Sequence, residues 1–471
     1  MERFISARTI GVLLFFCPSL ALAEPAFRVG FAERDITPDP KKRTVYLAGF
    51  GHNRQATGIH DRLTARAWVI QTDRQKLAFV SLDLIGFFLA NVERVRNRLP
   101  NFDYVLVSST HNHEGPDTLG LWGPNPFRSG VDASYLQMVE AQVAAAVLQA
   151  EKNLQTATAR IGTVPLPHLI HDNREPYIKH DELVALEFFD SAQKRLGAVV
   201  QWNSHPETLG SRNTQISADF VGYTVKHLQH RLDVPVVYFT GTVGGLMTSL
   251  KTEIKDETGK LLADGTFAKT KRYGELVADA AEKALKNAKP IQLTPIRFRR
   301  AKVFIPIDNR LYLLGRQLKV LKRQAFVWTG NPEQAEPAKP ADVEKRLCLQ
   351  TELACLYLGE LGIAAIPGEI YPELVLGKVQ NPVDPGADFP DAEIEPAIYS
   401  QLRGKHRMLI GLANDEIGYI IPKRQWDAIP PYCYGRKKSQ YGEINSVGPE
   451  AAPILCGAFR RIAQNLAKDQ K

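Results

Sequence analysis

The sequence predicts an α/β fold with a mixed β-sheet core flanked by helices. Two observations lead to this prediction. Apolar runs rich in β-branched and aromatic residues recur along the chain, and stretches with helical periodicity separate several of them. Strands that alternate with helices are typical of a layered α/β core. Hydrophobic residues make up 44% and charged residues 23% of the chain, as in an ordinary globular protein, so disorder is not expected.

The expected strands begin at Phe27 and recur along most of the chain. They cover residues 27–31, 65–71, 77–82, 104–107, 159–164, 183–189, 198–202, 234–240, 353–358 and 361–366. Amphipathic periodicity predicts helices at residues 91–99, 135–150 and 272–288. The proline-rich stretch 330–341 is expected to be an exposed loop.

Residues 1–23 have the composition of a secretory signal peptide. Arg3 and Arg8 precede an apolar run at residues 10–16, and Ala21-Leu22-Ala23 offers small residues for cleavage. The run is shorter than the ~20 residues that a membrane-spanning helix needs, which disfavours a membrane anchor. We therefore expect a secreted or periplasmic protein whose mature chain, residues 24–471, forms a single domain.

The net charge of +8 comes from basic residues that are scattered along the chain. Short clusters such as Lys41-Lys42-Arg43 and Arg436-Lys437-Lys438 do not amount to the concentrated basic surface that nucleic acids require. A nucleic-acid partner is therefore not expected, whereas peripheral contact with an anionic membrane is compatible with this charge.

The cysteines of the expected mature chain are Cys348, Cys355, Cys433 and Cys456. They allow three pairings, among which the sequence does not choose. Cys348 and Cys355 lie along one apolar stretch, which makes their direct pairing awkward in a continuous strand. Free buried cysteines are equally compatible with the sequence.

The residues that carry chemistry begin at the end of the expected strand 104–107. The chain continues there as Ser109-Thr110-His111-Asn112-His113-Glu114, and Gly115-Pro116 then breaks regular structure. Side chains two residues apart in an extended backbone point to the same side, so His111 and His113 can converge on one point. This arrangement favours a metal site, although two loop histidines with ordinary hydrogen bonds would have the same sequence.

Three further strand ends carry polar residues in the same arrangement. Residues 199–202 lead to His205-Pro206, and residues 364–366 lead to Pro367-Gly368-Glu369. Residues 408–410 lead through Asn414 to Gly418-Tyr419. Several rigid strand ends that converge are a common source of metal ligands.

In their joint order, these motifs resemble the catalytic domain of the neutral/alkaline non-lysosomal ceramidases. The resemblance extends from about residue 27 to residue 455. It rests on Asp35-Ile36-Thr37-Pro38, Gly58-Ile59-His60-Asp61, Ser109-Thr110-His111-Asn112-His113, Asn173-Arg174, His205-Pro206, Pro367-Gly368-Glu369, Gly411-Leu412-Ala413-Asn414 and Gly418-Tyr419.

The resemblance implies a zinc-dependent amide hydrolase. By motif, the implied zinc ligands are His111, His205, Glu369 and Tyr419, and the residues implied to line the active site are His113, Arg174 and Tyr441. Zinc held by imidazole and oxygen ligands lowers the pKa of a bound water from 15.7 to roughly 7.

Acid–base and electrostatic roles follow from the same residues. His113 or Glu114 is the candidate general base and acid, and Arg174 or Tyr441 is the candidate for stabilising the oxyanion. His60 and Asp83 are interpreted as structural residues or as hydrogen-bond partners of the ligands.

The sequence departs from the family pattern in several places. Gly245 and Met247 stand where ceramidases have aspartate and serine, so a serine nucleophile is not expected here. We expect water to be the nucleophile instead. The family's Asn-Arg-Ser-Pro is Asn173-Arg174-Glu175-Pro176 here. We also expect no room for the family's additional C-terminal β-domain.

The leading hypothesis is a zinc amidase that cleaves an N-acyl lipid such as ceramide. One alternative is a zinc hydrolase of the same fold that acts on another amide, an ester or an acetyl group. The other is a non-catalytic lipid- or ligand-binding protein on a decayed enzyme scaffold. An apolar groove near Leu119-Gly120-Leu121-Trp122 would favour the lipid, and a narrow polar pocket would favour the first alternative.

Overall fold

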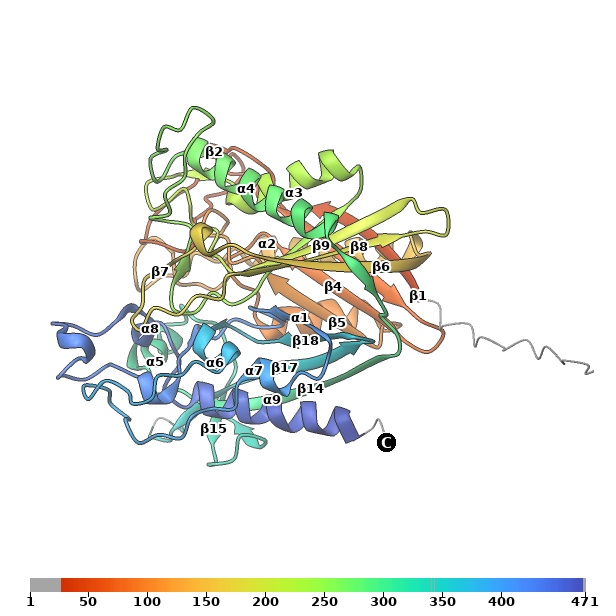
Figure 1. Cartoon of the computed structure of the whole chain (residues 1–471). Coiled ribbons are helices and arrows are strands. Elements are labelled where there is room, and N and C mark those ends of the chain that lie inside the picture. Colours follow the sequence, from red (N-terminus) through yellow and green to blue (C-terminus); the bar gives the residue numbers. More distant parts are fainter. Residues whose placement is uncertain (1–26, 340, 343, 469–471) are drawn as a thin grey trace, which may run out of the picture.

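Two β-sheets packed face to face form the centre of the molecule (Figure 1). The computed structural model describes residues 27–468 except residues 340 and 343. The expected signal peptide, residues 1–23, lies outside the described residues. Helices cover the outer face of each sheet, so the layers follow the order helix, sheet, sheet, helix. The predicted α/β fold with mixed β-sheets is confirmed.

The first sheet contains nine strands that run in both directions. In order across the sheet, its main path is β11 (Val236–Thr240), β9 (Arg195–Trp202), β8 (Glu182–Phe189), β6 (Gln155–Pro165), β1 (Phe27–Asp35), β3 (Thr64–Gln71), β4 (Lys76–Leu82) and β5 (Tyr104–Ser109). The additional strand β13 (Lys289–Ile291) pairs with β6. The pairs at the two ends of the path, β11 with β9 and β4 with β5, are parallel. Parallel neighbours need a crossover, which α3 (Asp219–Leu232) and α1 (Leu89–Asn97) provide.

The second sheet contains six strands. Its main path is β16 (Ala335–Pro337), β15 (Ala325–Trp328), β17 (Leu347–Leu358), β18 (Leu361–Ala365) and β20 (His406–Ile410), and β14 (Ile296–Pro306) also pairs with β17. β18 and β20 are parallel, so their carboxyl ends lie side by side.

The strands are apolar on both faces because each face is covered. In β4, Leu77 and Phe79 lie in the core between the two sheets, whereas Ala78 and Val80 pack under the helices of the outer face. This alternation with a period of two residues explains why the strands appear in the sequence as nearly continuous apolar runs.

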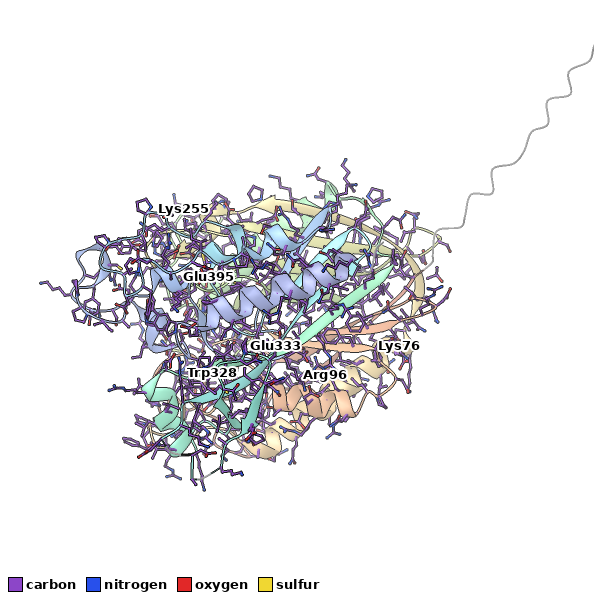
Figure 2. The ribbon with its side chains drawn as sticks, turned by 90° about the horizontal axis from the view of Figure 1, so that it is seen from below. Lys76, Arg96, Lys255, Trp328, Glu333 and Glu395 are labelled. Carbon is purple, nitrogen blue, oxygen red and sulfur yellow. The ribbon has the colours of Figure 1, made fainter. Side chains whose placement is uncertain are left out.

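The outer layers are built from amphipathic helices. α2 (Ala133–Lys152), α3 and α4 (Phe267–Lys286) pack on the first sheet. α9 (Ala451–Lys468), the long blue helix in Figure 2, crosses the outer face of the second sheet. Its buried residues Leu455, Phe459, Ile462 and Leu466 repeat at helical spacing. Among the described residues, no helix is both long and apolar enough to cross a membrane.

The strands and helices expected from the sequence are present, with ends that differ by a few residues. Residues 330–341 contain the short strand β16, and their described side chains are exposed or half-buried. Within the described part of the chain, the four cysteines are buried and form no disulfide.

Candidate metal centre and active site

Strand ends from the two sheets meet at one place in the molecule. β5 leads to His111 and His113, β9 leads to His205, and β18 leads to Glu369. Tyr419 follows β20 and is the direct partner of Glu369 in the short parallel ladder of β19 (Glu369–Ile370) and β21 (Tyr419–Ile420). Rigid strands therefore position all five side chains.

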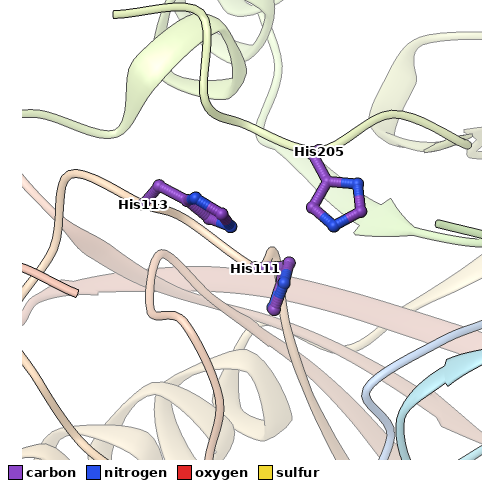
Figure 3. A group of neighbouring side chains, drawn as sticks. All are labelled: His111, His113 and His205. Atoms are coloured by element: carbon purple, nitrogen blue, oxygen red, sulfur yellow. The ribbon is translucent and has the colours of Figure 1, made fainter. Parts of the chain in front are cut away.

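Three imidazoles face one another at this point (Figure 3). The ligand nitrogens of His111, His113 and His205 lie within 4.8 Å of one another, and the three side chains are buried. His111 Nδ1–H donates a 2.7 Å hydrogen bond to the carbonyl oxygen of Ile85. His205 Nδ1–H donates one of 2.7 Å to the carbonyl oxygen of Met247. These bonds fix both rings so that Nε2 is left for the site.

The carboxylate of Glu369 faces these Nε2 atoms. Its Oε2 atom lies 2.9 Å from His205 Nε2 and 3.4 Å from His111 Nε2. Both Nε2 atoms therefore face one carboxylate oxygen, so a single cation could contact all three atoms. Two imidazole nitrogens and a carboxylate oxygen are donors that zinc prefers. Burial opposes ionisation of Glu369, but His111 and His205 hold its pKa below the usual range.

Two tyrosines stand on the other side of Glu369. Tyr419 is buried, and burial together with the charge of Glu369 raises the pKa of its phenol well above the usual value. The ring of Tyr441 lies 5.9 Å from that of Tyr419, and its side chain is 56% exposed. Tyr419 therefore adds a phenol oxygen beside the proposed ligands, while Tyr441 stands nearer to solvent.

His113 has no hydrogen-bond partner for either ring nitrogen among the described residues. Its Nδ1 atom lies 3.5 Å from Oε2 of Glu207. Burial and the neighbouring His111 and His205 hold the pKa of His113 well below its usual value, so the ring is neutral and has a free lone pair. Gly49 packs on this ring with φ 90°, and a Cβ added there would come within 2.3 Å of His113 Cγ. Only glycine fits at position 49 without displacing the imidazole.

The side chain of Glu114 points away from the other candidates. Its Oε2 atom accepts hydrogen bonds from Arg54 Nη1 at 3.1 Å and from Asn213 Nδ2 at 2.7 Å. Arg54 also donates to the carbonyl oxygens of Ala48 and His113. Burial raises the pKa of Glu114 to about 8, although Arg54 lowers it. Glu114 therefore supports the histidine loop through Arg54 and does not face the other site residues.

Arg174 is likewise engaged behind the site. Its guanidinium donates to Glu443 Oε2 at 2.8 Å and to the carbonyl oxygen of Gln425 at 2.8 Å. It also stacks on Tyr371, with 5.1 Å between Arg174 Cζ and the ring centroid. The Tyr371 ring lies 6.0 Å from that of Tyr419. The structure thus places Arg174 in a layer that backs Tyr419.

The two remaining sequence candidates make structural contacts. His60 Nδ1 lies 2.8 Å from Asp61 Oδ2, and its half-exposed ring stacks on Phe267. Asp83 pairs with Arg66 at 2.7 Å, and its carbonyl oxygen accepts a hydrogen bond from Asn112 Nδ2. Asp83 therefore helps to position the loop between the two histidines.

Two acidic residues at the site did not appear among the sequence candidates. Glu207 follows His205 by two residues, the same spacing that singled out His111 and His113, so its approach to His113 had a recognisable signal. Glu416 lines the pocket, and burial raises the pKa of its carboxyl group well above the usual value.

The loop that contains Gly245 and Met247, where the resemblance implies an aspartate and a serine, contacts His205. Gly245 and Leu246 have φ values of 77° and 60°, and this turn presents the Met247 carbonyl oxygen to His205. The same oxygen accepts a hydrogen bond from the His205 backbone N–H at 2.9 Å. The altered loop therefore orients one of the proposed ligands.

A pocket of about 430 Å³ lies in front of the candidate metal site. His111, His113, Glu369 and Tyr419 are part of its lining. Much of the remaining wall is apolar and includes Phe50, Phe88, Leu119, Leu121, Trp122, Phe127, Leu311, Leu314, Leu318 and Ile444. The segment Leu119–Trp122 thus contributes to an apolar groove, the feature that distinguishes a lipid site from a narrow polar one.

Residues 27–241 match the sequence model of the family described as neutral/alkaline non-lysosomal ceramidase, N-terminal. The predicted relationship to the ceramidases is confirmed. The neutral ceramidase of Pseudomonas aeruginosa is 25% identical over 303 residues, which cover 57% of this chain and 44% of that protein. The matched region therefore spans less than half the length of this relative.

Solved ceramidase structures share the fold. The crystal structure of neutral ceramidase from Pseudomonas aeruginosa superposes with a TM-score of 0.70 at 17% identity, over 95% of this chain and 75% of that one. A ceramidase complexed with C2 superposes with a TM-score of 0.70 at 16% identity, over 95% of this chain and 76% of that one.

Proposed function

We propose that the chain is a zinc-dependent hydrolase that cleaves the amide bond of an N-acyl lipid such as ceramide. The observation that carries this proposal is the approach of Glu369 to the Nε2 atoms of His111 and His205 in the lining of an apolar pocket. The match to the ceramidases supports the reaction class, and the apolar wall supports a substrate with an acyl chain.

His111, His205, Glu369 and Tyr419 are the residues that would hold the metal. When bound, zinc would supply Lewis-acid polarisation of the amide carbonyl and a lower pKa for the attacking water. The fixed rings of His111 and His205 keep their Nε2 atoms in place before any metal binds, which reduces the cost of ordering the ligands.

His113 is the residue best placed to move protons. Its neutral ring accepts the proton of the water that attacks the carbonyl carbon and returns it to the leaving nitrogen. The C–N bond then breaks to give a carboxylic acid and an amine. Glu207, 3.5 Å from Nδ1, orients the ring, and Tyr441 is the phenol available to hydrogen-bond the substrate.

We also propose a location outside the cytoplasm and contact with membranes. The composition of residues 1–23 supports export to an extracellular or periplasmic compartment. The net charge of +8 supports peripheral contact with anionic membranes, in which an N-acyl lipid would be presented.

A non-catalytic binding protein is the rival candidate, because Gly245 and Met247 replace the family's aspartate and serine. The hydrogen bonds from His205 to the Met247 carbonyl oxygen argue against a decayed site, since the altered loop still fixes a ligand. A hydrolase for small polar amides, esters or acetyl groups fits the apolar wall less well.

The test combines zinc content with fatty-acid release from a fluorescent short-chain ceramide. The wild type should bind about one zinc ion per chain and release the acid only with zinc present. His111→Ala should lose both properties, whereas the matched control His60→Ala should keep both because His60 lies on Asp61 and Phe267. Zinc without release would redirect the search to other amides and esters, and no zinc under metal-replete conditions would overturn the proposal.

A further inference from the structure

The mouth of the pocket is surrounded by exposed apolar side chains. Leu121, Phe127, Leu311, Leu314, Leu318 and Ile444, which we call the apolar rim, are each at least 40% exposed and all line the pocket. They come from three separate parts of the sequence: the loop after Asp117, α5 (Arg310–Gln317) with the residue after it, and α8 (Tyr441–Ile444). Figure 1 shows α5 and α8 together at one end of the molecule. Single exposed leucines are ordinary, but a contiguous apolar patch marks a surface that is covered in function.

α5 presents its leucines to the outside. Asn309 caps the helix by accepting hydrogen bonds from the backbone N–H groups of Leu311 and Tyr312, and none of its residues is fully buried. Leu311, Leu314 and Leu318 follow one another at intervals of three and four residues, so they share one face. The helix is therefore amphipathic with its apolar face directed to the pocket mouth and to solvent.

Positive charge accompanies this apolar face. Residues 310–323 contain Arg310, Arg316, Lys319, Lys322 and Arg323 and no acidic residue. Arg323 pairs with Asp415, but Arg310, Lys319 and Lys322 are exposed and have no ion-pair partner among the described residues. Arg128, also exposed and without such a partner, follows the rim residue Phe127 in the sequence. Leucines flanked by unpaired cations match a surface of acyl chains below anionic headgroups.

We propose that the apolar rim and the flanking cations Arg128, Arg310 and Lys319 dock on the surface of an anionic lipid bilayer. The pocket then opens directly onto the membrane, and a lipid enters it without crossing water. This inference rests on the proposed function for the nature of the lipid, but docking itself depends only on the rim and its charges.

The test is flotation of the intact protein with vesicles that contain no substrate. Wild type should float with phosphatidylcholine vesicles that contain phosphatidylglycerol, less with phosphatidylcholine alone, and less at high salt. Arg128→Gln/Arg310→Gln/Lys319→Gln should weaken binding to the anionic vesicles by roughly a hundredfold, because three cations that favour an anionic surface are removed. Phe127→Ser/Leu318→Ser should weaken binding to both kinds of vesicle.

Two controls separate docking from catalysis and from folding. Leu261→Ser and Lys255→Gln alter exposed residues that do not line the pocket, and these variants should float like wild type. The triple glutamine variant changes no pocket-lining residue, so it should hydrolyse a soluble short-chain ceramide at the wild-type rate if the proposed function holds. Vesicle binding without hydrolysis by any form would refute the function and leave docking intact.

The docking proposal is overturned if wild type does not float with anionic vesicles, or if the rim and charge variants float equally well. A rim-dependent dimer in size-exclusion chromatography without vesicle binding would also overturn it, because the rim would then be covered by a second copy of the chain.

Discussion

Replacing Arg54 by methionine should destabilise the protein strongly. Arg54 and Glu114 form a buried pair at 3.1 Å, with side-chain exposures of 6% and 0%. Removal of the guanidinium leaves the buried Glu114 carboxyl group without its partner and the carbonyl oxygens of Ala48 and His113 without their donor. Each buried acceptor that loses its donor costs about 1–3 kcal/mol, so we expect a total loss of about 3–5 kcal/mol. This is a large fraction of the roughly 5–15 kcal/mol that stabilises a typical domain.

The stability of the protein should also depend on pH through Glu114. Burial raises the pKa of Glu114 to about 8 in the folded protein, above its ordinary value of 4.5, so the folded state binds more protons than the unfolded state between these values. Stability from this group therefore falls as pH rises toward 8. Arg54 lowers the pKa of Glu114, so in Arg54→Met the loss of stability with rising pH should continue to a higher pH than in wild type.

Urea denaturation of wild type, Arg54→Met, Glu114→Gln and the double variant measures the coupling free energy between Arg54 and Glu114. We expect a large loss for Arg54→Met, a smaller one for Glu114→Gln, and a coupling free energy of about 2 kcal/mol. Hydrolysis by Glu114→Gln should persist, because Glu114 faces Arg54 and Asn213. Abolished hydrolysis with unchanged stability and zinc content would instead identify Glu114 as a proton carrier.

Three further perturbations have defined outcomes. Burial lowers the pKa of His180 from 6.5 to about 4, so between these pH values the unfolded state binds more protons and the stability of the protein falls as pH falls. His180→Asn should remove up to roughly 3 kcal/mol of this loss, as measured by denaturation at several pH values. An unchanged dependence of the unfolding free energy on pH would contradict this expectation. Gly49→Ala should lower the stability of the fold by about 1–3 kcal/mol and slow hydrolysis, because the added Cβ displaces His113. Gly51→Ala is the control: a Cβ there meets no atom within 4 Å, so this variant should match wild type in thermal unfolding and kinetics. Removal of zinc by a chelator should abolish hydrolysis and lower Tm, because free zinc at a thousandfold excess over its Kd stabilises the folded state by about 4 kcal/mol. Equal Tm values with and without zinc would contradict metal binding to the folded chain.

The sequence was sufficient to predict the elements whose signal is local. Apolar runs such as residues 77–82 are buried on both faces, so their composition alone identifies strands. The candidate ligands were recognisable because His111, His205 and Glu369 each follow such a run. α9 also has an apolar repeat at helical spacing, at Leu455, Phe459, Ile462 and Leu466, although it was not among the expected helices.

The features that depend on distant pairing were not predictable. β14 contains Arg297, Arg299 and Arg300, which obscure its strand character, and it is defined by its pairing with β17 about fifty residues later. The ion pair between Arg54 and Glu114 joins residues 60 positions apart. No local pattern shows that Glu114 turns to Arg54, or that the Met247 carbonyl oxygen meets His205. These contacts follow from the packing of the two sheets.

X-ray absorption spectroscopy of the zinc-loaded protein would identify the atoms that bind the metal. We expect a shell of nitrogen and oxygen ligands at about 2.0–2.2 Å with outer-shell scattering from imidazole and no sulfur. This imidazole signal should weaken in His205→Ala and persist in His60→Ala. A zinc–sulfur distance near 2.3 Å, or a shell that His205→Ala leaves unchanged, would place the metal elsewhere and contradict the assignment.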